Sequence, residues 1–565
     1  MAKTIFGTSD KSNFILNMDL DKFRSACGEI AMIIFWSTAL SQLMSHMLGS
    51  AEMGLSEIAN SGGLAGVLVF LLLLVRRTSV IFSLAAVFAL FATAIGLMRK
   101  QFSKATAAPY LLLSGSLIWA MISRFHSYDL RTSLLGYSGH EEGWFALLMY
   151  AGIFYLGTMV RGKADRERFV RRLMGFGIAQ GVVGLIQALP FVDYIDPSKG
   201  LNPYRNIDPL LYWNVRLPAG MTDSPINYAM MLGMVGAAAV PAAMLSEEKK
   251  TRVLAKICLF LSVVMSLKTQ TVAGLIAGFG LLLLTLIMAV AKRKTAFSKA
   301  APCVLTFAAV ILAAGWIYAS PRINQTYFHP DRTELSDKRW PKGIMVRGWE
   351  DDVSDVVLEN AFVFDKNTDG KTYPALYDGG IVWDNGYYRL FNIGAYTPFK
   401  EHDFEIYDAF SVLRYCWEQG VRAVKIDPLL GVGPDNFVYT QLKTSYDISG
   451  NPNSVDAPYN EYLYIAGTRG IPSLLMHLAL VVCCFVLAWK RRKNGSSWIR
   501  LSACCAAVLY LLTAIVGTSV LTVVPVFFAL LGLTAADPLA ETEKAAAPAD
   551  PEKAEKKNKK DKKAK

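Results

Sequence analysis

The most polar and most patterned stretch of the chain is residues 411–470, SVLRYCWEQGVRAVKIDPLLGVGPDNFVYTQLKTSYDISGNPNSVDAPYNEYLYIAGTRG. Its apolar spacing predicts an amphipathic helix over 411–425, and a Gly-Pro-rich turn follows over 428–434. A second short helix, a Gly-Asn-Pro loop and a third helix beginning near Pro458 complete the pattern. An apolar segment begins directly afterwards at Ile471. We therefore expect a structured helical cap at a membrane surface, held in place by the rest of the chain.

The rest of the chain is dominated by apolar segments long enough to cross a bilayer. Hydrophobic residues make up 53% of the 565 residues, and the mean hydropathy is +0.32. A membrane-spanning helix needs about 20 apolar residues. The sequence thus predicts an all-α polytopic membrane protein with 12 or 13 transmembrane helices, the short segment 62–75 being the one whose crossing stays open. The predicted spans are 28–47, 62–75, 79–98, 107–123, 144–160, 173–191, 226–245, 252–268, 271–291, 301–319, 471–489, 500–516 and 518–535.

The connections between these segments alternate in charge. Basic links occur at 161–172, 249–252, 292–299 and 490–493, whereas the links at 191–225, 269–270 and 517 are poor in Lys and Arg. The positive-inside rule places the basic links in the cytoplasm and the large loop 320–470 outside. The N-terminal quarter alternates less cleanly, and Lys3, Lys11, Lys22 and Arg24 favour a cytoplasmic N-terminus with 12 spans.

This alternation gives the predicted organisation of the chain. It comprises an N-terminal cytoplasmic segment 1–27, transmembrane helices with short outer loops over 28–319, an extracytoplasmic loop 320–410 with a β insertion, the extracytoplasmic cap 411–470, C-terminal transmembrane helices over 471–535, and a disordered basic cytoplasmic tail 536–565.

The loop 320–410 contains a strand-and-hairpin pattern. Apolar and polar residues alternate in VVLENAFVFD (356–365) and GGIVWDNGYYRLFNIG (379–394), with turn residues between them. The intervening Asp365, Asn367 and Asp369 open like an EF-hand calcium loop, but its twelfth position is Leu376 instead of a bidentate glutamate. A hairpin turn is therefore favoured, and no metal site is predicted.

The basic tail ends in KAEKKNKKDKKAK and has almost nothing to bury. Such a tail can bind nucleic acid, but on a membrane protein it is better explained by anionic lipid at the cytoplasmic surface. Membrane lipids are therefore expected partners, and nucleic acid is not.

Several outer residues could carry chemistry. Arg216 and Arg414 offer forked guanidinium donors that suit a diphosphate, although each could also be a solvated surface charge. His140, next to two glutamates in a Gly-rich loop, could act as a general base near neutral pH, or it could be part of an ordinary polar loop. Lys268, at a tight turn between two spans, is expected to face solvent.

An ordered set of motifs resembles the O-antigen ligase / O-antigen polymerase superfamily over most of residues 120–535. The C-terminal match consists of Pro428-Leu-Leu-Gly431-Val-Gly433-Pro434-Asp-Asn436-Phe437, Asn460-Glu461-Tyr462-Leu463 and Gly470-Ile-Pro. Earlier matches are Gly136–Gly143, Arg216 with Gly220, Pro225 and Asn227, and Arg414 followed by Trp417. Gly220 falls one position late, and Ile226 separates Pro225 from Asn227.

The resemblance implies a membrane glycosyltransferase of the cell envelope. Such enzymes move a polysaccharide or oligosaccharide from an undecaprenyl-diphosphate carrier to an acceptor glycan, lipid or protein, on the extracytoplasmic face of the cytoplasmic membrane. The leaving group is already a diphosphate, so arginines above the bilayer can stabilise it, and no metal or cofactor is required in principle. Ligase and polymerase are not separated by these motifs.

The position of the base is left open by one departure, because Tyr459 stands where the family has a histidine. An unperturbed phenol has a pKa of about 10, so Tyr459 is a poor base at neutral pH. Glu461 or His140 could replace it, with Tyr459 orienting the acceptor. Asn460, Glu142 and Asn436 are expected to support the site.

Two other classes of function remain as alternatives. A non-catalytic relative that binds surface glycan would be consistent with Tyr459. A polysaccharide transporter or flippase would need charged or polar residues in the middle of its spans, and the sequence shows few of these.

Overall fold

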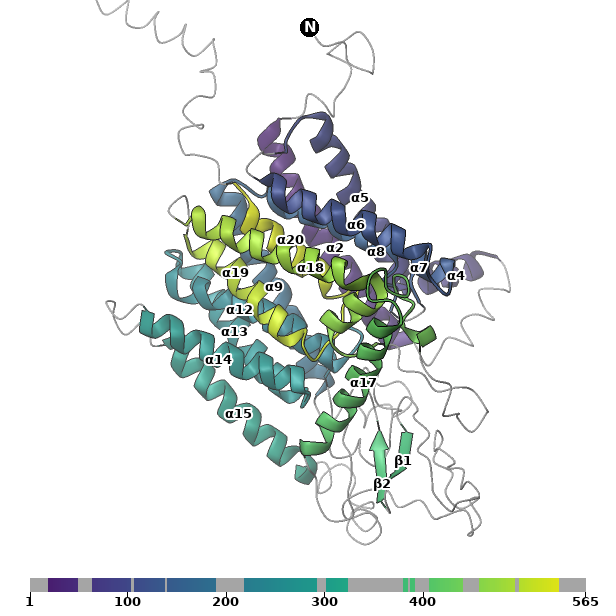
Figure 1. The fold of residues 1–565 in the computed structure, drawn as a ribbon. Helices are drawn as coiled ribbons and strands as arrows, with labels where there is room; N and C mark the ends of the chain where they lie inside the picture. Colours follow the sequence, from purple (N-terminus) through teal and green to yellow (C-terminus); the bar gives the residue numbers. More distant parts are fainter. Residues whose placement is uncertain are drawn as a thin grey trace, which may run out of the picture.

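The computed structural model describes residues 19–48, 63–102, 106–137, 140–188, 218–291, 301–323, 380–384, 387–391, 406–440, 457–492 and 497–537 (Figure 1). Nearly all of them are helical. The helices are α2 (Leu20–Leu48), α4 (Gly63–Val75), α5 (Thr78–Met98), α6 (Ala107–Arg124), α7 (Leu130–Leu135), α8 (Trp144–Met159), α9 (Lys163–Gln187), α12 (Pro225–Leu245), α13 (Lys249–Lys268), α14 (Val272–Ala291), α15 (Ala301–Ile323), α17 (Ile406–Ile426), η7 (Phe437–Thr440), α18 (Glu461–Lys490), α19 (Ser497–Thr513) and α20 (Val524–Ala535).

The helix α12 lies at the centre of the bundle. Nearly all of its side chains are buried, and it packs against α13, α19, α14 and α9. Helices α8 and α20 cross so closely that a Cβ atom on Gly157 would overlap with the backbone of Ala529, and one on Gly532 with that of Phe154. Small residues allow this approach of helices where the hydrophobic effect does not drive association.

The outer surface of the bundle is apolar. Six of the described helices, α2, α5, α9, α12, α14 and α18, are long and apolar enough to cross a membrane. Large apolar side chains such as Phe91, Leu111, Leu283, Phe307 and Leu475 are 59–73% exposed. A continuous apolar exterior of this kind is typical of a surface that faces lipid.

Every predicted span overlaps with a helix, but the connection between the last two spans is longer than predicted. The expected link at residue 517 is a non-helical segment over 514–523, and α20 begins only at Val524. The segment is apolar, so hydropathy could not distinguish it from the adjoining helices.

The helices predicted within residues 411–470 are present in the described parts of that stretch. An amphipathic helix, α17, precedes the Gly-Pro-rich turn, and η7 follows. Helix α18 begins at Glu461 and bends at Gly470, whose φ of 79° and ψ of 162° are not helical. The turn packs into this bend: Ile471 N donates to Pro428 O at 2.8 Å, and Val432 N to Gly467 O at 3.0 Å.

A small antiparallel hairpin lies within the predicted β insertion. Strand β1 (Gly380–Asp384) pairs with β2 (Tyr387–Phe391), with Gly380 opposite Phe391 and Asp384 opposite Tyr387. The rest of the predicted insertion over 320–410, up to the start of α17, lies outside the described residues, as do the candidate calcium loop at 365–376 and the basic tail after Asp537.

The bundle has two polar ends. At one end, His46 Nε2 bonds Thr222 O at 2.6 Å, and Thr522 Oγ1 donates to Asp223 Oδ1 at 3.0 Å. The turn 428–434 and the start of α18 lie at this same end, because Glu461 N donates to Ala514 O at 2.9 Å. Arginines gather at the other end, where the basic links begin.

The expectation that Lys268 faces solvent is wrong. Its side chain is fully buried, and the ammonium group lies 5.1 Å from the centre of the Trp316 ring. The turn that follows Lys268 is as short as predicted, but α15 covers it. A cation over an indole ring gains electrostatic stabilisation that partly replaces hydration.

Candidate functional site

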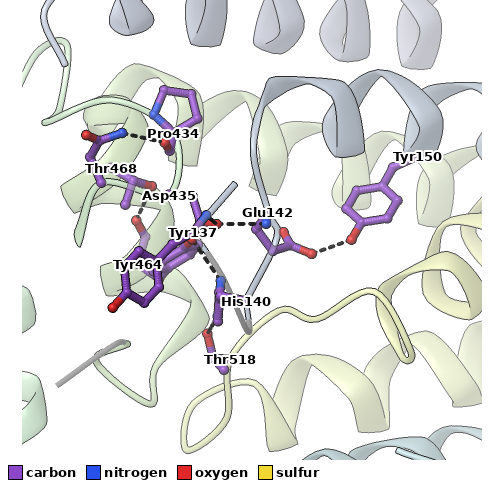
Figure 2. Close-up of polar contacts among 10 residues, drawn as sticks. Tyr137, His140, Glu142, Tyr150, Pro434, Asp435, Tyr464, Thr468 and Thr518 are labelled. Carbon is purple, nitrogen blue, oxygen red and sulfur yellow. Dashed lines mark hydrogen bonds and ion pairs between the residues drawn. The ribbon is translucent and has the colours of Figure 1, made fainter. Parts of the chain in front are cut away.

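One buried carboxylate joins the loops at the end of the bundle where the turn 428–434 and the start of α18 lie. We call this the site end. Asp435 is 3% exposed and accepts hydrogen bonds from Tyr137 N at 2.6 Å, from Glu142 N at 2.9 Å and from the Tyr464 hydroxyl (Figure 2). Its Oδ1 also lies 2.9 Å from His140 Nδ1. The Gly-Pro-rich turn thus holds the 136–143 loop against α18, although these segments lie about 300 positions apart in the chain.

The ring of His140 bridges Asp435 and the segment before α20. His140 is 5% exposed, and its Nε2 lies 3.2 Å from Thr518 Oγ1. Figure 2 marks this contact with a dashed line. When Nδ1–H donates to Asp435, Nε2 is left to accept from the Thr518 hydroxyl. The order carboxylate–imidazole–hydroxyl can activate a nucleophile. Because these contacts join the 136–143 loop, Asp435 and the segment before α20, we assign the arrangement to holding the three segments together.

Two further carboxylates and an arginine lie beside this network, and we call Glu142, Glu461 and Arg469 the carboxylate–arginine cluster. Glu142 accepts from the Tyr150 hydroxyl, and Glu461 Oε2 accepts from the Tyr510 hydroxyl at 2.6 Å. All three members are at most 8% exposed. The two carboxylates interact electrostatically with each other and with Arg469.

Burial changes the acidity of the loop carboxylate in this cluster. Removal from water raises the pKa of Glu142, and the electrostatic effects of His140 and Arg469 offset only part of that rise. The Tyr150 hydroxyl bond also favours the ionised form. Glu142 is therefore a carboxyl group whose proton is held more tightly than that of an exposed glutamate.

The asparagines that the sequence singled out have structural contacts. Asn436 Nδ2 donates to Ser133 Oγ at 2.7 Å, and Asn436 Oδ1 accepts from Asp129 N at 2.8 Å, which fixes α7 against the turn. Asn460 caps α18, because its Oδ1 accepts from Leu463 N at 3.0 Å. Both residues position their neighbours.

Tyr459 adopts an unusual backbone conformation. Its φ is 45°, and its carbonyl oxygen accepts from Trp417 Nε1 at 3.2 Å, which ties the start of α18 to α17. Glu141 and Asp435 also have positive φ, at 60° and 56°. Non-glycine residues rarely adopt this conformation, and such strain is concentrated at functional sites. Its occurrence in all three converging loops supports a functional role for the site.

The two arginines predicted to clamp a diphosphate are not placed by the structure. Arg216 lies outside the described residues, and Arg414 lies on α17 with its side chain not described. Within the described ranges, no group of three His, Cys, Asp or Glu side chains is arranged to hold a metal ion. The described part of the site consists of the residues above.

The structure adds residues that sequence reasoning missed, namely Asp435, Tyr464, Thr518 and Arg469. Asp435 stands inside the motif at 428–437, and its place directly before Asn436 in a Gly-Pro-rich turn was an available signal. Arg469 precedes Gly470 of the last motif. Nothing local indicated Thr518, because it was expected inside an apolar span.

Comparison with known proteins gives no family for this chain. No protein-family model and no curated protein matches it.

Proposed function

We propose that this protein is a membrane glycosyltransferase of the O-antigen ligase or polymerase type, which transfers a glycan from an undecaprenyl-diphosphate carrier to an acceptor. One observation carries the proposal: the segments 136–143, 428–437 and 459–470, which carry the resemblance, converge on one polar site at the end of an apolar helix bundle. The site would face the extracytoplasmic side of the cytoplasmic membrane.

Arg469 gives the site a buried positive charge for the leaving diphosphate. It is 8% exposed, and no hydrogen bond or ion pair joins its guanidinium to the described residues. A guanidinium held near the reacting bond stabilises the negative charge that develops as the carrier diphosphate leaves. Arg216 and Arg414 would complete this role.

Glu461 is the best-placed base. Both ring nitrogens of His140 already have partners, whereas Glu461 engages only Oε2, with Tyr510, among the described residues. The second carboxylate oxygen can accept the proton of an acceptor hydroxyl as the new glycosidic bond forms. Tyr459, directly before Asn460, would orient the acceptor.

The test is transfer of a labelled glycan from a polyprenyl-diphosphate donor by the full-length protein in lipid vesicles. Glu461→Gln keeps an acceptor for Tyr510 but removes the base, and we expect the rate to fall about 100-fold or more. Arg469→Lys keeps the positive charge but loses the forked donors of the guanidinium, and we expect the transfer rate to fall about tenfold. Arg422→Lys, on the surface of α17, is the matched control and should be unchanged.

Full activity of both site variants would refute these roles. If only Tyr459→His acquired transfer activity and the natural protein had none, the chain would be a glycan-binding relative without catalysis.

A further inference from the structure

The other polar end of the bundle contains arginines that are almost completely buried. Arg166 in the first turn of α9 is 2% exposed, Arg500 in the first turn of α19 is 4% exposed, and Arg491 after α18 is 8% exposed. Helix α9 continues to Gln187, whose side chain binds the 219–220 loop at the site end. At 1.5 Å per residue, Arg166 is therefore about 30 Å from that end.

Other arginines of α9 have acidic partners on the surface. Arg171 pairs with Glu248 at 2.7 Å, and Arg172 pairs with Glu29. Arg168 lies 3.8 Å from Asp165. These pairs are partly exposed, as expected for ordinary surface ion pairs.

Arg166 differs from them because none of the described acidic side chains forms an ion pair with it. Its Nε and Nη2 atoms are buried and have no hydrogen-bond partner in the described part of the chain. The like charge of Arg500 acts on it. Arg500 itself donates a hydrogen bond to the carbonyl oxygen of Arg491. Arg491 in turn forms an ion pair with Asp537, in which Nε lies 3.7 Å from Oδ1.

This arrangement is unfavourable unless an anion completes it. An arginine side chain stays protonated in proteins, so it cannot become neutral to avoid burial. A buried charge without a counter-charge is strongly destabilising, and a second guanidinium nearby adds repulsion. Phosphate oxygens match the forked donors of guanidinium groups, and basic pockets between transmembrane helices bind anionic lipid headgroups.

We propose that Arg166 and Arg500 form a binding site for a phosphate group between the starts of α9 and α19, at the end of the bundle opposite the candidate active site. The group belongs either to an anionic phospholipid headgroup or to free phosphate. The site is independent of the proposed transferase activity. The bound phosphate supplies the counter-charge that Arg166 lacks among the described residues, and it holds the ends of the two helices together.

The experiment uses the full-length protein, delipidated in an uncharged detergent, and measures its thermal unfolding with three additions. These are phosphatidylglycerol, phosphatidylcholine and inorganic phosphate. We expect phosphatidylglycerol or inorganic phosphate to raise the Tm by about 2 °C or more, because a ligand stabilises the folded state that binds it. A shift with inorganic phosphate identifies free phosphate as sufficient, whereas a shift with phosphatidylglycerol alone identifies the headgroup.

The variant Arg166→Gln removes the charge and should abolish the shift, while the delipidated variant should be as stable as the natural protein or more so. Arg171→Gln, at a paired surface arginine on the same helix, should keep the full shift. Native mass spectrometry of the unmodified protein provides a measurement that needs no variant and should detect retained anionic phospholipid or phosphate.

The proposal is overturned if neither phosphatidylglycerol nor inorganic phosphate shifts the Tm. It is also overturned if the zwitterionic phosphatidylcholine raises the Tm as much as phosphatidylglycerol does. It is also overturned if Arg166→Gln and Arg500→Gln both keep the full shift.

Discussion

Among single residues, Asp435 has the largest structural role at the site end. Its buried carboxylate accepts from four donors in two segments, the 136–143 loop and α18. Replacing one carboxylate oxygen of Asp435 by an amide NH2 group places a hydrogen-bond donor opposite groups that are themselves donors. A buried donor left without an acceptor costs about 1–3 kcal/mol.

We therefore expect Asp435→Asn to lower the free energy of unfolding by about 2–3 kcal/mol, measured by thermal or denaturant unfolding in detergent. The matched control is Asp427→Asn in the same turn. Asp427 Oδ1 accepts from Leu429 N and Leu430 N at a partly exposed position, and an asparagine oxygen can do the same. Equal stability of the two variants would mean that the Asp435 contacts contribute little.

Glu142 predicts a pH dependence of stability. Burial raises its pKa above the ordinary value of 4.5, so the folded protein keeps this proton at pH values where the unfolded chain has lost it. The stabilisation is complete below about pH 4.5 and is lost as the pH rises through the folded-state pKa. Glu142→Gln keeps an acceptor for Tyr150 and removes the titration.

We thus expect the Tm of Glu142→Gln, relative to the natural protein, to increase from pH 4.5 towards pH 8. The exposed Glu247→Gln is the control for loss of a glutamate outside the site. A difference that stays constant with pH for Glu142→Gln would show that the folded-state pKa of Glu142 is not raised.

The sequence could identify several of these residues but could not predict their contacts. His140, Glu142 and Asn436 were singled out by their neighbours and by a resemblance. His140 and Glu142 contact Asp435, and Asn436 holds α7 against the same turn. Which side chains bind one another depends on segments about 300 positions apart, and local pattern contains no information about that pairing. The same reason explains why Thr518 was missed.

Among the elements, the bend in α18 requires a glycine at position 470. Gly470 has a φ of 79°, and a Cβ atom there would overlap with the carbonyl oxygen of Leu429 in the turn that packs into the bend. Positive φ and a close backbone approach are both tolerated by glycine and not by alanine. The bend separates the cap portion of α18 from its apolar portion.

We expect Gly470→Ala to lower the free energy of unfolding by about 3 kcal/mol and to disturb the loops around Asp435. In Gly175→Ala, on α9, the added methyl group meets open space, and alanine is favoured over glycine inside a helix by about 1 kcal/mol. That control should be as stable as the natural protein or slightly more so. The comparison is made by unfolding in detergent, and a neutral Gly470→Ala would show that the bend can relax.

Element prediction succeeded wherever hydropathy or amphipathic spacing was strong, as in α12, α14 and α17. It failed at 514–523, because this non-helical segment is as apolar as the helices beside it. Hydropathy reports which segments avoid water, and it does not report whether their backbone is helical.

Across the whole molecule, the two polar ends lie at a distance that suits a bilayer. From the bend at Gly470 to Lys490, α18 rises about 30 Å, which matches the hydrocarbon thickness. The candidate active site lies near the start of this span and the buried arginines near its end. The charge alternation of the links predicts that the arginine end is cytoplasmic.

Labelling with a membrane-impermeant maleimide in intact cells tests this orientation. A cysteine introduced at Gly380 should react, and one introduced at Ala554 should react only after the membrane is opened. The parent protein, whose described cysteines form no disulfide bond, supplies the background. The reverse pattern would invert the orientation and place the candidate site in the cytoplasm.

The network around Asp435 also has a consequence for biosynthesis. Asp435 is synthesised 295 residues after His140, and Thr518 is synthesised 378 residues after it. At about 5–20 residues per second, roughly 20–75 s separate synthesis of the ring from synthesis of its last partner. During that interval an unpaired polar loop lies beside newly inserted helices. Chains that stop before residue 518 lack the last partner of the His140 ring. We therefore expect such chains to be substrates for membrane quality-control proteases.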